Sequence, residues 1–501
     1  PYSYGLVGAR NQERIGWVAY EKGVRNIWTA ASPGFEPVQL TGYTEDDGQR
    51  ISHLRFTSDG SLLMFEKGNA EGANPRSDPT HPQVALHAIN LATLDAWKIA
   101  LGSGARISPD DSQFVYRHEG KLMRRVLSHQ KPAEEQGGDE SERVDSTVLF
   151  NARGDIVSYT WSPDGSRLAF TSVRGDHSFI GVYHLADETI QWISPGVDFD
   201  SNPSWSPDGI HIAFFRTNGL KKDELRSLVE SRRVSLWVGD VTDGTARKIW
   251  APDSDNGFFA QMYPDQPLTW AANRRILFYS EHRGWLHIYS IDPDGGNLEN
   301  LTPGECEAEH SAVSHDGQAL FFSSNCHAGD EWDRDRRHLW VNSTRGGKPK
   351  KVTSGKGIET DPVPIAQSDL IAFRQAGTRK PTGISMIRRN GRQPTTVFPG
   401  QLPGSYPAQE MIEPQQVVFQ AADGVKVHGQ LFLPSGAAAG DNRPALIYMH
   451  GGPIRQMLLG YHYRGEYYAF AYAMNQYLAS KGYVVLSVNY RAGIGYGREF
   501  R

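Results

Sequence analysis

Apolar and polar residues alternate along short stretches of this chain, and many of these stretches follow the same polar turn. The clearest copies are Trp161–Phe170 and Trp205–Phe214, which both begin Trp-Ser-Pro-Asp-Gly. In such a turn the proline fixes the φ angle of one residue, the aspartate side chain accepts hydrogen bonds from the turn backbone, and the glycine adopts a positive φ. The alternation of apolar and polar residues that follows is typical of a half-buried strand. Each copy therefore predicts strand, tight turn and strand.

The turn recurs through the first four hundred residues. Weaker copies are Phe56–Gly60, Ile107–Asp111, Trp270–Phe278, Val313–Gly317 and Pro364–Phe373. Each copy precedes a second strand pair, and successive turns lie 43 to 65 residues apart. A propeller blade has four strands in about 40 to 50 residues, so the longer steps contain insertions, expected as solvated loops at 131–143 and 221–233. With an opening unit at Ile15–Leu40, the repeats predict an all-β propeller of eight blades, with seven as the alternative.

The pattern changes after residue 410. Residues 417–431 form two alternating stretches around Asp423-Gly424, which predicts a hairpin. The apolar runs 445–449 and 484–488 suit buried parallel strands, and Phe470, Met474 and Leu478 share one face of a helix between them. We therefore predict a propeller at 1–408 and the start of an α/β-hydrolase domain at 409–501.

Composition excludes several classes of protein. The 501 residues include 52 basic and 57 acidic ones without a long basic run, so nucleic acid is not expected as a partner. No apolar stretch approaches the ~20 residues of a membrane-spanning helix, and no metal-binding spacing or cofactor motif occurs. Cys306 and Cys326 are compatible with one disulfide or with two thiols. The localisation stays open, with the periplasm or secretion favoured over the cytoplasm. Whether the chain forms a homo-oligomer also stays open.

The candidate chemistry lies directly after the strand at 445–449, in His450-Gly451-Gly452-Pro453. Two adjacent glycines leave backbone N–H groups uncovered, so one can point at the negative charge that develops on a carbonyl oxygen. In α/β-hydrolases the corresponding loop supplies one donor of the oxyanion hole. A simple tight turn is the alternative. The Asn489–Gly497 segment, which reads Asn-Tyr-Arg-Ala-Gly-Ile-Gly-Tyr-Gly one helix later, favours the hydrolase interpretation.

The order of these features resembles the prolyl oligopeptidase family of serine peptidases, especially its acylaminoacyl-peptidase and dipeptidyl-peptidase branches. The resemblance implies that the propeller limits access to small peptides, and that the backbone N–H of Gly452 stabilises the oxyanion, with His450 and Gly451 as further candidates. His450 stands where the dipeptidyl peptidase IV branch places a tyrosine that assists. That branch holds the substrate amine with a glutamate pair, a role we do not assign to Glu134-Glu135.

A nucleophile elbow requires Gly-x-Ser-x-Gly, which is absent from the 501 residues. In the family that the chain resembles, the catalytic serine, aspartate and histidine all follow the Asn-Tyr-Arg segment. They are therefore expected after Arg501, and none of the 17 histidines is assigned as the base. Two parallel strands with an open edge and an uncovered face also make an unfinished domain. We expect an amino-terminal portion of a longer peptidase, inactive alone.

Two hypotheses of function follow. The first is a serine peptidase that acts on small peptides by acyl transfer, with an esterase on the same scaffold as a variant of it. The second is a non-catalytic propeller that binds peptides or partners and retains a vestigial hydrolase segment. The missing nucleophile favours the second hypothesis, whereas the intact Gly451-Gly452 loop favours the first.

Overall fold

The first 398 residues form eight four-stranded blades. The computed structural model describes residues 2–68, 83–131, 146–218, 233–254, 256–257, 266–326, 334–366, 368–391 and 393–501. Blades 1 and 2 contain β1 (Tyr2–Gly8), β2 (Arg14–Glu21), β3 (Val24–Ala31), β4 (Val38–Gln39), β5 (Ile51–Phe56), β6 (Leu62–Lys67), β7 (Ala85–Asn90) and β8 (Ala96–Leu101). Blades 3 and 4 contain β9 (Ser103–Ile107), β10 (Gln113–His118), β11 (Lys121–Val126), β12 (Thr147–Phe150), β13 (Asp155–Trp161), β14 (Arg167–Val173), β15 (Ser178–His184) and β16 (Thr189–Ile193).

The second half of the ring repeats this arrangement. Blades 5 and 6 contain β17 (Phe199–Trp205), β18 (His211–Thr217), β19 (Val234–Asp240), β20 (Ala246–Trp250), β21 (Leu268–Trp270), β22 (Ile276–Ser280), β23 (His287–Ile291) and β24 (Glu299–Asn300). Blades 7 and 8 contain β25 (Ala308–Val313), β26 (Ala319–Ser324), β27 (His338–Ser343), β28 (Lys350–Lys351), β29 (Ile358–Pro364), β30 (Leu370–Ala376), β31 (Gly383–Arg388) and β32 (Thr395–Phe398). Every blade is built from consecutive strands, and a parallel bridge between β15 and β17 joins the sheets of blades 4 and 5.

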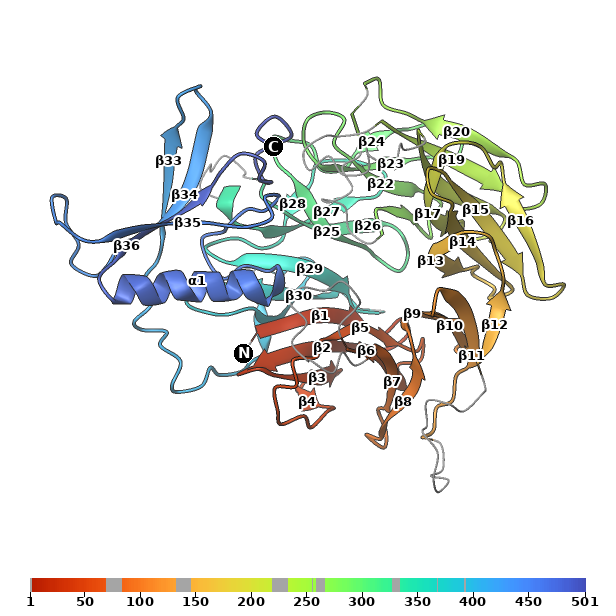
Figure 1. Ribbon diagram of the computed structural model, residues 1–501, viewed down its shortest axis with the longest axis horizontal. Helices are drawn as coiled ribbons and strands as arrows, with labels where there is room; N and C mark the ends of the chain where they lie inside the picture. Colours follow the sequence, from red (N-terminus) through yellow and green to blue (C-terminus); the bar gives the residue numbers. More distant parts are fainter. Residues whose placement is uncertain are drawn as a thin grey trace.

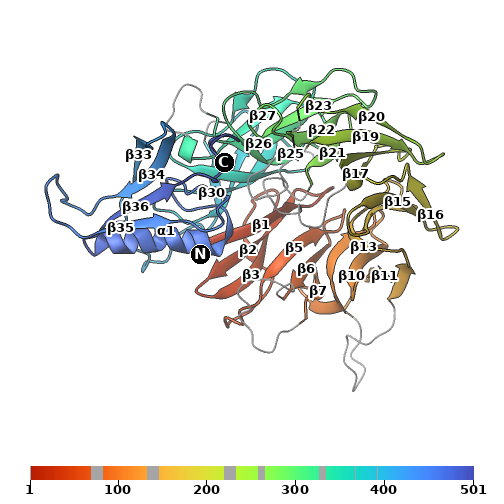
Figure 2. The same ribbon diagram turned by 45° about the horizontal axis from the view of Figure 1, so that its top comes forward.

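The blades follow one another around a ring, and blade 8 returns to blade 1 (Figures 1 and 2). The N–H of Ser3 in β1 donates to the carbonyl of Thr382 beside β31 at 2.8 Å. Within the described ranges, blades 1 and 8 exchange no strand. The ring therefore closes through contacts between complete blades, and the predicted fold class is confirmed with eight blades.

The recurring aspartates complete the turns. In the best copy, the Ser162 hydroxyl donates to Asp164 Oδ1 at 2.5 Å, and the N–H of Ser166 donates to the same oxygen at 3.1 Å. The same serine-to-aspartate bond occurs in three more turns, at Ser108–Asp110, Ser206–Asp208 and Ser314–Asp316. Most of the predicted insertions, 131–143 with Glu134-Glu135 and 221–233, lie outside the described residues.

A feature of the ring that sequence reasoning missed is a bulge in the first strand of most blades. Register shifts interrupt the pairing of these strands with their neighbours. The residues with positive φ at these bulges are Gly5, His53, Gly104, Asn202, His310 and Asp361. Bulges sharpen the local twist of a strand, and here they recur at one position per blade. They place His310 and Asp361 in the first strands of adjacent blades.

Residues 409–501, which we call the C-terminal segment, form a small mixed sheet with one helix. The sheet order is β33 (Gln415–Gln420), β34 (Lys426–Phe432), β36 (Val484–Asn489) and β35 (Ala445–Met449). Only β35 and β36 pair in parallel, and α1 (Gly465–Ser480) connects them. This is the predicted strand, helix and strand unit behind a hairpin, but the prediction that residues 445–449 are buried is wrong, because β35 is an edge strand whose side chains are mostly exposed. No helix in the described part of the chain is long and apolar enough to cross a membrane.

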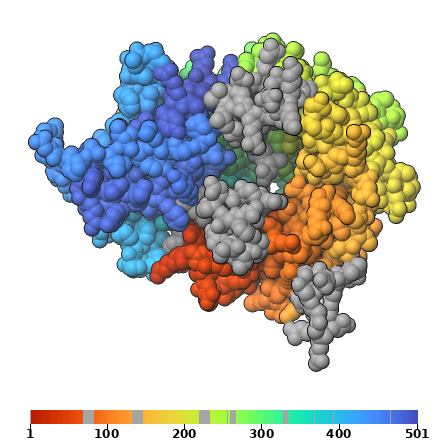
Figure 3. Space-filling model, viewed as in Figure 1, coloured from red at the N-terminus to blue at the C-terminus, as the bar shows by residue number. Residues whose placement is uncertain are grey.

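The C-terminal segment lies where the first and last blades meet, as the blue lobe of Figure 3 shows. One apolar cluster includes Tyr2 of blade 1, Ile358 of blade 8, and Phe432, Tyr472 and Val485 of the C-terminal segment. Burial of such side chains contributes about 1.5–3 kcal/mol each. The ring closure and the C-terminal segment therefore share a core.

Cys306 and Cys326 form a disulfide with a Cα separation of 4.9 Å. This resolves the alternative that the sequence left open. The bridge joins the chain just before β25 to the chain just after β26. It lies directly beside Glu307 in sequence, at the end of blade 7 that contacts the C-terminal segment.

Candidate active site

The loop after β35, residues 450–457, is called the glycine loop below. It begins with His450, whose side chain is only 2% exposed. The imidazole stacks on the Tyr490 ring with centroids 4.5 Å apart, and the Tyr490 hydroxyl donates to the His450 carbonyl. Burial lowers the pKa of His450, so the ring is neutral at pH 7. Tyr490 belongs to the second sequence motif, so the two motifs pack against each other.

The glycines of this loop are exposed, unlike His450. Gly452 adopts φ +130°, a conformation that side chains disfavour. Among the described residues, no acceptor receives the Gly452 N–H. The Gly451 carbonyl instead accepts the Tyr468 hydroxyl at 3.1 Å, which fixes the adjoining peptide. An N–H held in this way is available to a developing oxyanion, provided that the loop is rigid.

Asn489 at the end of β36 joins the glycine loop to the second motif. Its Oδ1 accepts the Met457 N–H at 2.7 Å, and its Nδ2 donates to the Met457 carbonyl at 2.9 Å. Nδ2 also donates to the Tyr496 hydroxyl at 2.8 Å. Asn489 is completely buried, so a substitution removes the acceptor of the Met457 N–H, while the Met457 carbonyl keeps the Gln430 amide at 2.9 Å. The asparagine of the Asn-Tyr-Arg motif thus fixes the backbone of Met457, the last residue of the glycine loop.

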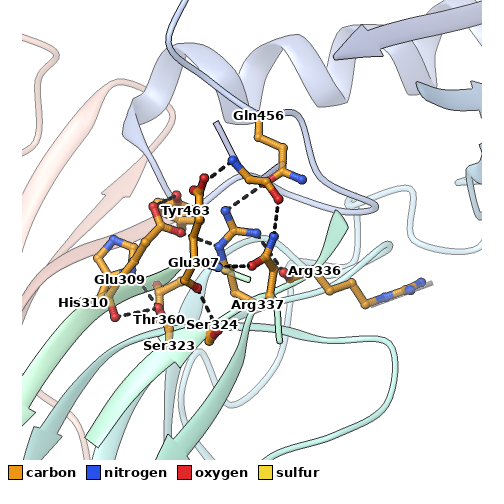
Figure 4. A network of polar contacts seen from close by, with 12 residues as sticks. Glu307, Glu309, His310, Ser323, Ser324, Arg336, Arg337, Thr360, Gln456 and Tyr463 are labelled. Atoms are coloured by element: carbon orange, nitrogen blue, oxygen red, sulfur yellow. Dashed lines mark hydrogen bonds and ion pairs between the residues drawn. The ribbon is translucent and has the colours of Figure 1, made fainter. Parts of the chain in front are cut away.

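A charged cluster of blade 7 lies under the same loop (Figure 4). Arg337, just before β27, is fully buried, and its Nε donates to Glu309. Its Nη2 donates to Gln456 Oε1 of the glycine loop at 2.8 Å. Tyr463, before α1, donates its hydroxyl to the other Glu309 oxygen at 2.9 Å. The propeller and the C-terminal segment are therefore joined by a buried polar network as well as by the apolar core.

Two glutamates of this network have opposite pKa shifts. Burial raises the pKa of Glu309, but the charges of Arg337 and His310 and the hydrogen bonds from Arg337 and Tyr463 together outweigh it and lower the pKa to about 2. For Glu307, burial and the Glu309 charge raise the pKa to about 7, against the smaller influence of Arg337. The Glu307 carboxylate accepts the N–H of Gly495 at 2.8 Å and that of Gly497 at 3.4 Å. Blade 7 therefore also contacts residues 490–501, called the C-terminal loop.

The shift of Glu307 predicts a pH dependence of stability. Its folded pKa of about 7 exceeds the ordinary value of 4.5, so the stabilisation it gives is complete below pH 4.5 and is lost as pH rises through 7. Glu307→Gln is therefore expected to reduce the fall in unfolding free energy between pH 5 and pH 8. Urea unfolding at intervals of half a pH unit measures it, with Glu36→Gln, at an exposed glutamate, as the control. An unchanged slope in Glu307→Gln contradicts the prediction.

Sequence reasoning identified the glycines, His450 and the Asn489–Gly497 motif, but it did not identify Arg337, Asp335 or Gln456. The charged run Arg334–Arg337 directly precedes β27, but charged side chains are mostly exposed, so the sequence gives no signal that these residues are buried. The sequence analysis assigned no catalytic triad. Ser52, His53 and Glu66 lie in contact, but both contacts use Nδ1 of His53. A triad histidine contacts the serine and the carboxylate through different ring nitrogens, so these three residues do not form one. No group of three or more described His, Cys, Asp or Glu side chains is placed to hold a metal ion.

Comparison with known proteins agrees with this arrangement. Residues 230–368 match the family described as dipeptidyl peptidase IV (DPP IV) N-terminal region. An uncharacterized peptidase YuxL of Bacillus subtilis (strain 168) is 36% identical over 87 residues, which are 17% of this chain and 12% of the relative. Dipeptidyl-peptidase 5 of Porphyromonas gingivalis is 25% identical over 170 residues, which are 32% of this chain and 23% of the relative. The matches thus span less than a quarter of these curated relatives.

A solved structure extends the likeness to the whole fold. The putative dipeptidyl aminopeptidase IV from Bacteroides ovatus superposes with a TM-score of 0.64 at 14% identity, covering 100% of this chain and 74% of that one. At this identity the superposition shows a shared fold. Together with the sequence matches, it confirms the resemblance to the prolyl oligopeptidase family, with both its acylaminoacyl-peptidase and its dipeptidyl-peptidase branches. The two curated relatives described above carry the names of peptidases.

Proposed function

We propose that this chain is the propeller, residues 1–408, and the first part of the catalytic domain, residues 409–501, of a serine peptidase that hydrolyses small peptides. The observation that carries the proposal is the N–H of the exposed residue Gly452, which has no acceptor among the described residues, in a loop held by Asn489 and Gln456. A fixed donor of this kind stabilises the oxyanion of acyl transfer. The peptidases similar to this chain support the same reaction class.

The reaction proposed is acyl transfer in two steps. A serine hydroxyl attacks the peptide carbonyl, a histidine takes its proton and passes it to the leaving amine, and an aspartate orients that histidine. Water then hydrolyses the acyl-enzyme. The Gly452 N–H donates to the carbonyl oxygen while it carries negative charge. His450, buried beneath Tyr490, supports the backbone of the loop in this scheme.

The serine, aspartate and histidine are proposed to lie in polypeptide that follows Arg501. The C-terminal segment supports this, because β35 is the edge of its sheet and exposes apolar side chains. Ile447 and Met449 of β35 are 63% and 70% exposed, and Phe470 of α1 is 53% exposed. Exposed apolar faces and unpaired strand edges favour association with further structure.

Labelling with a fluorophosphonate probe tests the proposed function. We expect the full-length product of the reading frame to be labelled on a serine beyond residue 501, and to cleave amide substrates. The matched control is the polypeptide 1–501, which is expected to remain unlabelled. A folded full-length protein that takes no label and cleaves neither amides nor esters contradicts the proposal and favours a non-catalytic binding propeller. Ester turnover without amide turnover identifies an esterase.

A further inference from the structure

Asp335 of the propeller is the acceptor for four side chains of the C-terminal segment. Oδ1 accepts the Gln456 amide at 2.9 Å and the Tyr496 hydroxyl. Oδ2 accepts the Gln416 amide at 2.5 Å and contacts His428 Nδ1 at 3.2 Å. The Asp335 carbonyl also accepts the Leu459 N–H at 3.0 Å. One residue of blade 7 thereby meets β33, β34, the glycine loop and the C-terminal loop.

Asp335 is completely buried, so these four donors replace its water. Burial alone raises the pKa of this carboxyl, but hydrogen bonds and the His428 charge outweigh it and hold the pKa below its ordinary value. A buried carboxylate is tolerated only when its oxygens are satisfied. The donors are therefore held in a fixed arrangement around the Asp335 oxygens, since moving any one of them exposes the charge to an apolar surrounding.

Gln456 connects this arrangement to the glycine loop. Its Nε2 donates to Asp335 Oδ1 and to the Arg334 carbonyl, both at 2.9 Å. Its Oε1 accepts Arg337 Nη2 at 2.8 Å, as Figure 4 shows. Asp335 and Arg337 thus hold opposite ends of one amide, which is 1% exposed. Blade 7 therefore holds both ends of the Gln456 amide.

Gln456 stands four residues after Gly452 in the glycine loop. The other anchors of this loop come from the C-terminal segment itself: Tyr490 at His450, Tyr468 at Gly451, Ile494 at Arg455 and Asn489 at Met457. Gln456 is the residue of the loop that bonds to the propeller, through Arg334, Asp335 and Arg337. A displacement of about 1 Å in the Gly452 peptide costs on the order of 10²-fold in rate.

We propose that Asp335 is a positioning residue for the oxyanion donor, acting through Gln456 to fix the Gly452 peptide. This inference rests on the proposed function. It assigns the propeller a part in the rate of the chemical step, in addition to limiting access of substrates. Asp335 itself touches no reacting atom, so its removal affects stabilisation of the transition state more than binding of the substrate.

The test compares three variants of the full-length protein. Asp335→Asn keeps the size of the side chain but turns an N–H₂ group toward two of the four donors. Gln456→Met removes the link while Asp335 keeps its Tyr496 and Gln416 contacts. Gln416→Leu is the matched control, because it removes one donor to Asp335 on the side away from the glycine loop. The readouts are kcat and KM for an amide substrate and the rate of fluorophosphonate labelling, all well below the unfolding temperature.

We expect Asp335→Asn and Gln456→Met to lower kcat and the labelling rate by about 10²-fold, with KM changed by less than about threefold. Gln416→Leu is expected to lose stability while kcat stays within about threefold of the parent. If Asp335→Asn does not fold, the kcat and the labelling rate of Gln456→Met test the inference. Folded Gln456→Met with kcat within threefold of the parent overturns the inference, as does an equal loss of kcat in Gln416→Leu. Absence of labelling and turnover in the parent protein instead overturns the proposed function, and the inference with it.

Discussion

Arg337→Met is expected to lower the free energy of unfolding by about 3–5 kcal/mol, the usual cost of removing one partner from a buried ion pair. Arg337 is fully buried and pairs with Glu309, whose side chain is 12% exposed and lies beside the buried Glu307. Without the guanidinium, the two carboxyl groups lie close together with little exposure to solvent. Gln456 also loses the donor to its Oε1. Urea unfolding at pH 7, followed by tryptophan fluorescence, measures the loss.

Arg388→Met is the matched control. Arg388 pairs with Asp369 at 2.6 Å, but its side chain is 66% exposed, and such surface pairs contribute about 0–1 kcal/mol. Adding Glu309→Gln to Arg337→Met removes one of the stranded charges and is expected to recover part of the loss. Equal losses in Arg337→Met and Arg388→Met contradict the account of the network.

The propeller could be predicted because its information is local. A turn such as Trp161–Phe170 needs only neighbouring residues to fold, and Asp164 bonds within its own turn. The bulges at His53 and His310 carry no such signal, because the sequence around them reads as ordinary strand. Their conformation depends on how complete blades pack around the ring. Local chemistry therefore predicted the blades and their number, but not the shape of their inner strands.

The candidate site divides in the same way. The Gly451-Gly452 pair and the Asn489 motif are recognisable because each needs a particular residue type in a short loop. Asp335 and Gln456 lie 121 residues apart, and their contact arises only when blade 7 meets the C-terminal segment. Charged side chains are mostly exposed, so the run Arg334–His338 gives no indication of burial by itself. The part of the site that the propeller contributes could be found only in the folded chain.

Gly495→Ala is expected to lower the free energy of unfolding by about 2–4 kcal/mol, through overpacking and a disfavoured φ. Gly495 has φ +96°, and a Cβ there would lie 2.1 Å from Gln456 Oε1 and 2.4 Å from Cδ. Gln456 cannot turn aside without breaking its bonds to Asp335 and Arg337. The N–H of Gly495 also donates to Glu307, so any shift of the C-terminal loop loosens that contact as well.

Gly482→Ala separates the two causes of this loss. Gly482 has a similar φ of +94°, but nothing lies within 4 Å of its Cβ position, so only the conformational cost of about 1 kcal/mol is expected there. In the double variant Gly495→Ala, Gln456→Ala, the amide that collides with the new Cβ is absent. Gly495→Ala is therefore expected to cost much less stability in the Gln456→Ala protein than in the parent protein. Urea unfolding of the parent, Gly482→Ala, Gly495→Ala, Gln456→Ala and the double variant gives these differences. Additive losses in the double variant mean that Gly495 acts through its φ alone, and that Gln456 is not held rigidly by the propeller.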